Sequence, residues 1–124
     1  MIGKNTIDID KIYSAVIEVA KTQGARFALI FGSFARGDYS KRSDLDVIFV
    51  EETRKRFIDR IGRYLDTLRD KESLKPFDID VLVYTPEEFE KMKKDGNRFI
   101  LWALREGKVL YEHREGQKNS IEVV

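Results

Sequence analysis

Two short segments, FGSFARG at residues 31–37 and SDLDV at residues 43–47, carry the most information in this chain of 124 residues. The first segment follows an apolar run at residues 26–31, which is rich in branched and aromatic side chains and predicts a buried strand. A strand that runs into Gly32-Ser33 at the start of a short helical turn presents backbone N–H groups and a hydroxyl, and such groups bind phosphate oxygens. The segment therefore predicts an anion-binding turn.

Carboxylates occur at the starts of two later strands. Asp44 and Asp46 lie two residues apart at the head of the next predicted strand, so strand periodicity turns both to one face. Asp80 interrupts another apolar strand, where an isolated charge is costly to bury. If these strands are neighbours, the three carboxylates form a cluster, and oxygen ligands without His or Cys favour Mg²⁺ or Mn²⁺. Asp78 lies at the start of its strand, and we expect it to be solvated or salt-bridged.

Apolar periodicity and capping signals predict eight elements. We expect helices near residues 9–20, 57–68, 86–96 and 99–106, and strands over residues 26–31, 45–50, 77–84 and 108–111. This order predicts an α/β (α+β) domain with a central mixed β-sheet and helices packed mainly on one face. Apolar residues at helical spacing, Phe57 and Ile58 among them, are expected to face the core. We expect the domain to span residues 1–112 and a polar tail to span residues 113–124.

Composition excludes several classes of protein. Lys and Arg number 23 against 22 Asp and Glu, and this balance argues against a nucleic-acid or membrane-surface binder. The absence of cysteine excludes disulfides, a thiolate nucleophile and Cys-ligated metals. No apolar run is long enough to span a bilayer and no signal peptide is evident, so we expect a cytoplasmic protein. His113, the single histidine, is expected to have no catalytic role, and Trp102 is expected in the core or at a partner interface.

The motifs resemble those of the nucleotidyltransferase superfamily that includes polymerase beta and kanamycin nucleotidyltransferase. The resemblance lies in Gly-Ser at residues 32–33, Asp-x-Asp at residues 44–46 and the later strand carboxylate Asp80. The chain is most similar to small stand-alone members, the minimal nucleotidyltransferase (MNT) proteins of bacteria and archaea, and the similarity extends over residues 9–112. No Walker-type or Gly-x-Gly-x-x-Gly motif supports a P-loop or Rossmann protein.

The resemblance implies a role for each motif residue. Gly32 and Ser33 would hold the triphosphate, and Arg36 would contact phosphate or fix the loop. The residues that would serve both as catalytic residues and as metal ligands are Asp44, Asp46 and Asp80. The implied cofactor is Mg²⁺, with Mn²⁺ as an alternative, and the implied nucleotide donor is ATP.

The resemblance also implies an activity and a partner. The activity is transfer of a nucleoside monophosphate, AMP from ATP, to a hydroxyl acceptor with release of pyrophosphate. MNT proteins are frequently paired, as antitoxins, with helical toxins of the HEPN type, so a HEPN-like protein is the expected partner and acceptor. The alternative is a non-catalytic module that binds nucleotide or occludes the toxin. Because the motifs and their sheet occupy most of the chain, we expect the acceptor or half its site on another chain, in a homo- or hetero-oligomer.

Overall fold

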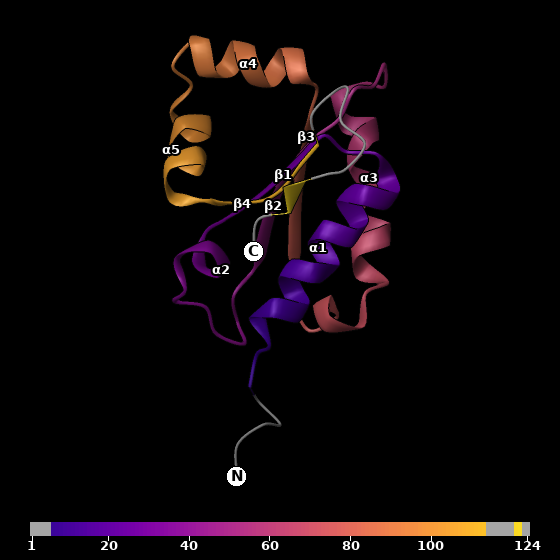
Figure 1. Ribbon diagram of the computed structural model, residues 1–124, viewed down its shortest axis with the longest axis vertical. Helices are drawn as coiled ribbons and strands as arrows, with labels where there is room; N and C mark the ends of the chain where they lie inside the picture. Colours follow the sequence, from indigo (N-terminus) through magenta and orange to yellow (C-terminus); the bar gives the residue numbers. More distant parts are fainter. Residues whose placement is uncertain (1–5, 114–120, 123–124) are drawn as a thin grey trace.

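The computed structural model describes residues 6–113 and 121–122 (Figure 1). The helices are α1 (Ile9–Gln23), α2 (Ser33–Arg36), α3 (Phe57–Arg69), α4 (Pro86–Lys94) and α5 (Arg98–Glu106), with a 3₁₀ turn η1 (Glu72–Leu74). The strands are β1 (Phe27–Phe31), β2 (Leu45–Val50), β3 (Ile79–Tyr84), β4 (Lys108–Glu112) and β5 (Ile121–Glu122). All eight predicted elements are present, α2 is the short helical turn expected at Gly32-Ser33, and η1 and β5 are additions to them.

The strands form one mixed sheet in the order β3-β2-β1-β4-β5. β2 and β3 are parallel, whereas β1 runs antiparallel to both β2 and β4. The end of β1 and the starts of β2 and β3 consequently meet at one edge of the sheet. This α+β architecture confirms the predicted fold class, and its topology brings the motif segments together.

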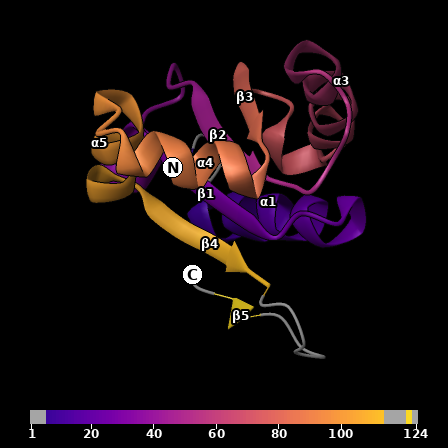
Figure 2. The same ribbon diagram turned by 90° about the horizontal axis from the view of Figure 1, so that it is seen from above.

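Helices cover both faces of the sheet to different extents. The larger core cluster joins α1 and α3 to one face through residues such as Val16, Val47 and Leu68. A smaller cluster joins α4 and α5 to the other face through residues such as Ile48 and Ile100. Figure 2 shows these two pairs of helices on opposite sides of the sheet. The two longest helices share one face as predicted, and α4 and α5 give the second face a partial cover.

Capping residues fix where the helices begin. Asp8 accepts a hydrogen bond from the backbone N–H of Lys11 at the start of α1. Thr85 and Glu88 form a reciprocal capping box at the start of α4, with distances of 2.9 and 3.1 Å. Such caps satisfy backbone donors that have no partner within the helix. They explain why the chain turns from strand to helix directly after β3.

The buried face of α3 differs from the prediction. Phe57 is 40% exposed and Ile58 is 74% exposed, although both were expected to face the core. The buried line is instead formed by Arg60, Tyr64 and Leu68, at helical spacing of four residues. The guanidinium of Arg60 and the hydroxyl of Tyr64 can be buried because carboxylates on other elements accept their hydrogen bonds.

The C-terminal part of the chain is only partly described. Tyr111 and Glu112 of β4 pair in an antiparallel register with Glu122 and Ile121 of β5. The rest of the predicted polar tail after His113 lies outside the described residues. Among the described helices, none is both long enough and apolar enough to cross a membrane.

Candidate active site

The three predicted carboxylates lie at the sheet edge where β1 ends and where β2 and β3 begin. We call Asp44, Asp46 and Asp80 at this place the acid edge. Asp46 is in register with Phe31 on one side and with Asp80 on the other. Just before them, the backbone N–H of Leu45 donates to the carbonyl of Asp78 over 2.9 Å and holds the two strand starts together.

Strand alternation sets the face on which the acid edge lies. Leu45 and Val47 belong to the core under α1 and α3, so Asp46 between them points to the opposite face, which α4 and α5 partly cover. Asp46 is half-buried, whereas Asp44 and Asp80 are exposed. The acid edge therefore combines one carboxylate that is fixed against the sheet with two that a ligand can reach.

Electrostatic repulsion is concentrated on Asp46. Burial, the negative charge of Asp80, a hydrogen bond with Asp80 and the charge of Asp44 together raise the pKa of Asp46 to about 6. A carboxyl that stays protonated beside another carboxylate at mildly acidic pH indicates that the negative charges at this site repel one another. A divalent cation would relieve this repulsion.

The donor set suits a hard divalent cation. All three side chains offer carboxylate oxygens, which are the ligands preferred by Mg²⁺ and Mn²⁺. Among the described residues, no three Asp, Glu, His or Cys side chains are arranged as a group that could hold a metal ion, and this includes the three of the acid edge. Mg²⁺ typically keeps several waters and takes further ligands from substrate phosphates, so a partial protein cage fits its chemistry.

Gly32 brings the phosphate-binding turn into contact with the acid edge. Its φ of 75° lies in a region that residues with a side chain rarely adopt. A Cβ at this position would also lie 2.7 Å from Oδ2 of Asp46, so the carboxylate would have to shift to admit a side chain. The backbone conformation favours glycine here, and the close approach places the backbone beside the carboxylate.

The short helix α2 is anchored in the core. Phe34 is fully buried, stacks on Tyr39 with ring centroids 5.2 Å apart, and meets Phe77 edge-on at 5.1 Å. The hydroxyl of Tyr13 on α1 donates a buried hydrogen bond of 2.7 Å to the Phe34 carbonyl. These contacts hold the turn rigidly, so its N–H groups keep their direction before any ligand binds.

Ser33 and Arg36 occupy the two ends of α2. Ser33 is its half-buried first residue, where backbone N–H groups have no partner within the helix. Arg36 is the last residue, and its Nε lies 3.4 Å from Oδ2 of Asp38 in the exposed loop that follows. This exposed ion pair is compatible with both roles expected for Arg36, phosphate contact and loop fixing.

The acid edge lies outside three cavities of the described part of the chain. Cavities of about 380 and 570 Å³ lie between the start of α1 and η1. A third, of about 310 Å³, lies between α4, α5 and the sheet near Phe89 and Val109. None of these three is lined by Gly32, Ser33 or a carboxylate of the acid edge. The candidate site is an open edge of the sheet rather than an enclosed pocket.

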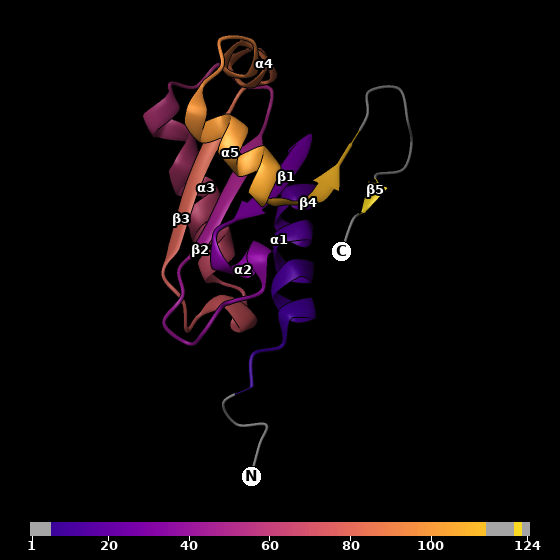
Figure 3. The ribbon, with the colours of Figure 1, turned by 90° about the vertical axis from the view of Figure 1, so that its left-hand side faces the viewer.

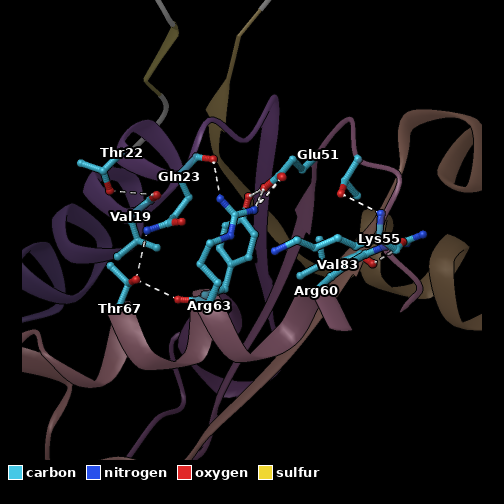
Figure 4. A network of polar contacts seen from close by, with 11 residues as sticks. Val19, Thr22, Gln23, Glu51, Lys55, Arg60, Arg63, Thr67 and Val83 are labelled. Atoms are coloured by element: carbon cyan, nitrogen blue, oxygen red, sulfur yellow. Dashed lines mark hydrogen bonds and ion pairs between the residues drawn. The ribbon is translucent and has the colours of Figure 1, made fainter. Parts of the chain in front are cut away.

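A second charged cluster lies at the opposite end of β2 and β3, and we call it the arginine end. Nη2 of Arg63 lies 2.5 and 2.6 Å from the two carboxylate oxygens of Glu51, which follows β2 (Figure 4). Tyr64 donates its hydroxyl to the same carboxylate, and burial together with this carboxylate raises the pKa of Tyr64.

Arg60 completes the arginine end. Its guanidinium donates to both oxygens of Glu88 over 2.6 and 3.2 Å, and also to the carbonyls of Val83 and Lys55. Sequence reasoning missed this cluster. Two arginines three residues apart on a helix are an ordinary surface pattern, and only the fold brings them to Glu51 and Glu88.

The fold and the acid edge define a domain of the nucleotidyltransferase type. The sequence model described as "Polymerase beta, Nucleotidyltransferase" matches residues 14–116, a range that includes the Gly-Ser turn and all three carboxylates. The chain belongs to the polymerase beta nucleotidyltransferase family.

One solved structure has the same fold. It is a crystal structure of a proposed nucleotidyltransferase from Sulfolobus solfataricus, 23% identical in sequence, with a TM-score of 0.53. The likeness covers 87% of this chain and 83% of that one. A search of curated proteins finds no match. The family supports nucleotidyl transfer as the general activity, with a nucleoside triphosphate as substrate.

Proposed function

We propose that this protein transfers a nucleoside monophosphate, AMP from ATP, to a hydroxyl acceptor at the acid edge and releases pyrophosphate. The observation that carries the proposal is the contact between Gly32 and Asp46. It puts the phosphate-binding turn directly beside the carboxylates, so a triphosphate on the turn would have its phosphorus atoms next to a metal-binding group. Neither the turn nor the acids alone would specify this chemistry.

The residues have separate tasks in this reaction. Backbone N–H groups at the start of α2 and the hydroxyl of Ser33 would bind the triphosphate. The residues that would hold Mg²⁺ are Asp44, Asp46 and Asp80. When bound, the cation neutralises phosphate charge and lowers the pKa of an acceptor hydroxyl.

Bond making and breaking balance at the α-phosphorus. The acceptor oxygen forms a bond to it, and the bond to the oxygen bridging the α- and β-phosphates breaks to release pyrophosphate. The carboxylate of Asp80, which is exposed, would accept the proton of the acceptor hydroxyl.

For the acceptor, we propose a hydroxyl on a helical HEPN-type partner, with this chain as the MNT antitoxin of the pair. The exposure of Asp44 and Asp80 on an open sheet edge supports a macromolecular acceptor, because a protein surface can reach these carboxylates. An enclosed pocket would admit only small molecules.

Label transfer tests the proposal. The chain is incubated with α-labelled ATP, Mg²⁺ and a helical HEPN-type protein, and we expect label on that protein. The Asp44→Asn/Asp46→Asn double variant should transfer none, whereas the matched control Asp78→Asn, at the start of the same sheet edge, should transfer normally. Equal transfer by the double variant would contradict the proposal. A double variant that transfers no label and still neutralises the toxin would favour occlusion.

A further inference from the structure

An aromatic surface of α5 lies beside the acid edge. It consists of Phe99 and Trp102, which rest on Phe31 of β1, and we call it the aromatic edge. We propose that the aromatic edge binds the base of the nucleoside triphosphate by stacking, and that it selects bases by ring area rather than by hydrogen bonds. This inference rests on the proposed function, because the acid edge must hold the phosphates of the same nucleotide.

Phe31 links the two surfaces. It directly precedes Gly32 and is in register with Asp46, so its side chain shares a face with that carboxylate. The ring of Phe31 meets Phe99 edge-on at 5.4 Å and Trp102 edge-on at 5.8 Å.

Phe31 lies between the aromatic edge and Asp46. The cross-strand spacing from Asp46 to Phe31 and the ring contacts of Phe31 together give a separation on the order of 10 Å. Figure 3 shows α5 crossing this face of the sheet just above α2. A ribose links base and phosphates in a nucleotide, so one ligand can contact both surfaces.

The side chains of the aromatic edge are not fully buried in the hydrophobic core. Phe99 and Trp102 are three residues apart on α5 and contact the sheet through Phe31, and Trp102 packs against the core cluster in which Ile100 and Ala103 are buried. Phe99 remains 36% exposed and Trp102 is half-buried. Folding therefore leaves aromatic area at the surface, next to a phosphate-binding turn.

The chemistry of these side chains determines what they can distinguish. Stacking on an aromatic side chain strengthens binding about 5- to 150-fold and accepts every base, since every base has a π-face. Apart from the single indole N–H of Trp102, the side chains of Phe31, Phe99 and Trp102 have no hydrogen-bonding group that could recognise the edge of a base. We expect stacking on the aromatic edge to favour purine over pyrimidine nucleotides and to contribute almost equally to the binding of ATP and of GTP.

Trp102 makes the test direct, because it is the one tryptophan of the chain. Its fluorescence is followed while wild-type protein is titrated with Mg-ATP and, separately, with Mg-tripolyphosphate. A base stacked on the indole should quench the emission, and tripolyphosphate, which lacks a base, should leave it nearly unchanged.

Calorimetry on variants completes the test. Phe99→Leu and Trp102→Leu should weaken Mg-ATP binding about 5- to 150-fold and change tripolyphosphate binding less than about twofold. The control Phe57→Leu removes an equally exposed aromatic ring from α3 and should change neither. Thermal melts confirm that each variant is folded.

Each result has a distinct meaning. If wild-type protein binds both ligands and the α5 variants match it, or if they lose both ligands equally, base stacking is overturned and the proposed function stands. If wild-type protein binds neither ligand, the proposed function and the inference both fail.

Discussion

Charged side chains cluster at both ends of β2 and β3. At one end the carboxylates are paired with arginines, and at the other end they lie beside further carboxylates. At the arginine end, Glu51 and Glu88 each have a guanidinium nitrogen within 2.5 or 2.6 Å. The hydrogen bond from Arg60 lowers the pKa of Glu88. At the acid edge, the charged neighbours that act on Asp46 are Asp80 and Asp44, and they help to raise its pKa to about 6.

The difference separates structural charge from functional charge. Paired carboxylates at the arginine end accept hydrogen bonds from Arg60, Arg63 and Tyr64 of α3, and of these buried groups Nε of Arg63 is left without a partner. The acid edge does the reverse, since its repulsion costs stability in the protein alone. The acid edge keeps this repulsion next to the turn that we propose binds phosphate, and a bound cation would relieve it.

The largest expected effect is on catalysis. The Asp44→Asn/Asp46→Asn variant should lose about 10³-fold in nucleotidyl transfer, because metal stabilisation of the transition state contributes several kcal/mol. Glu88→Gln, a carboxylate change at the arginine end, should stay within about threefold of wild type. Initial rates of label transfer provide the comparison, and comparable losses in the two variants would remove the functional distinction between the ends.

Stability should respond in the opposite way. Glu51→Gln leaves Arg63 and Tyr64 without their charged acceptor and should lower the free energy of unfolding by about 2 kcal/mol, allowing for the partial exposure of Arg63. The Tm should fall by about 8 °C. Thermal unfolding measures this directly, and an unchanged Tm would mean that the arginine end does not hold α3 in place.

The acid edge predicts a smaller effect that depends on pH. The folded-state pKa of Asp46, about 6, lies above its ordinary value of 3.8, so the folded state binds the extra proton between these values. Without metal, stability therefore falls as pH rises from about 4 to 6, and the loss is complete above pH 6.

Asp46→Asn removes this penalty. Because Asp46 is half-exposed, screening reduces the expected gain to about 1 kcal/mol, or about 4 °C in Tm, at pH 7.5. At pH 4 the variant and the wild type should unfold at nearly the same temperature. A variant less stable than wild type at pH 7.5 would show that Asp46 is well compensated.

The smallest effect concerns Arg36. Its ion pair with Asp38 is exposed, so Arg36→Ala should change stability by less than about 0.5 kcal/mol. Loss of one positive charge near the turn should weaken tripolyphosphate binding about fivefold, which corresponds to about 1 kcal/mol. Calorimetry with wild-type protein and the variant decides between a phosphate contact and a purely local role, for which affinity would not change.

Local patterns made the acid edge predictable. The spacing of Asp44 and Asp46 predicted a common face for them, and an acid within an apolar strand singled out Asp80. The contact between Gly32 and Asp46 was beyond sequence reasoning, because it depends on the register between β1 and β2.

Long-range pairing also explains the error on α3. Whether Arg60 or Ile58 faces the core depends on Glu88, which lies 28 residues beyond Arg60 in the sequence. Apolar periodicity cannot include such a partner. For the same reason the sequence left Trp102 open between core and interface, and only its ring contact with Phe31 places it beside the site.

Binding of ATP, measured by calorimetry in the presence and in the absence of Mg²⁺, tests the central claim most directly. Three proteins are compared: wild type, Asp44→Asn/Asp46→Asn and the control Asp78→Asn. We predict metal-dependent binding of equal affinity to wild type and control, and none to the double variant. Equal binding by the double variant, or no binding by the wild type, would contradict the assignment of the acid edge as the site of nucleotidyl transfer.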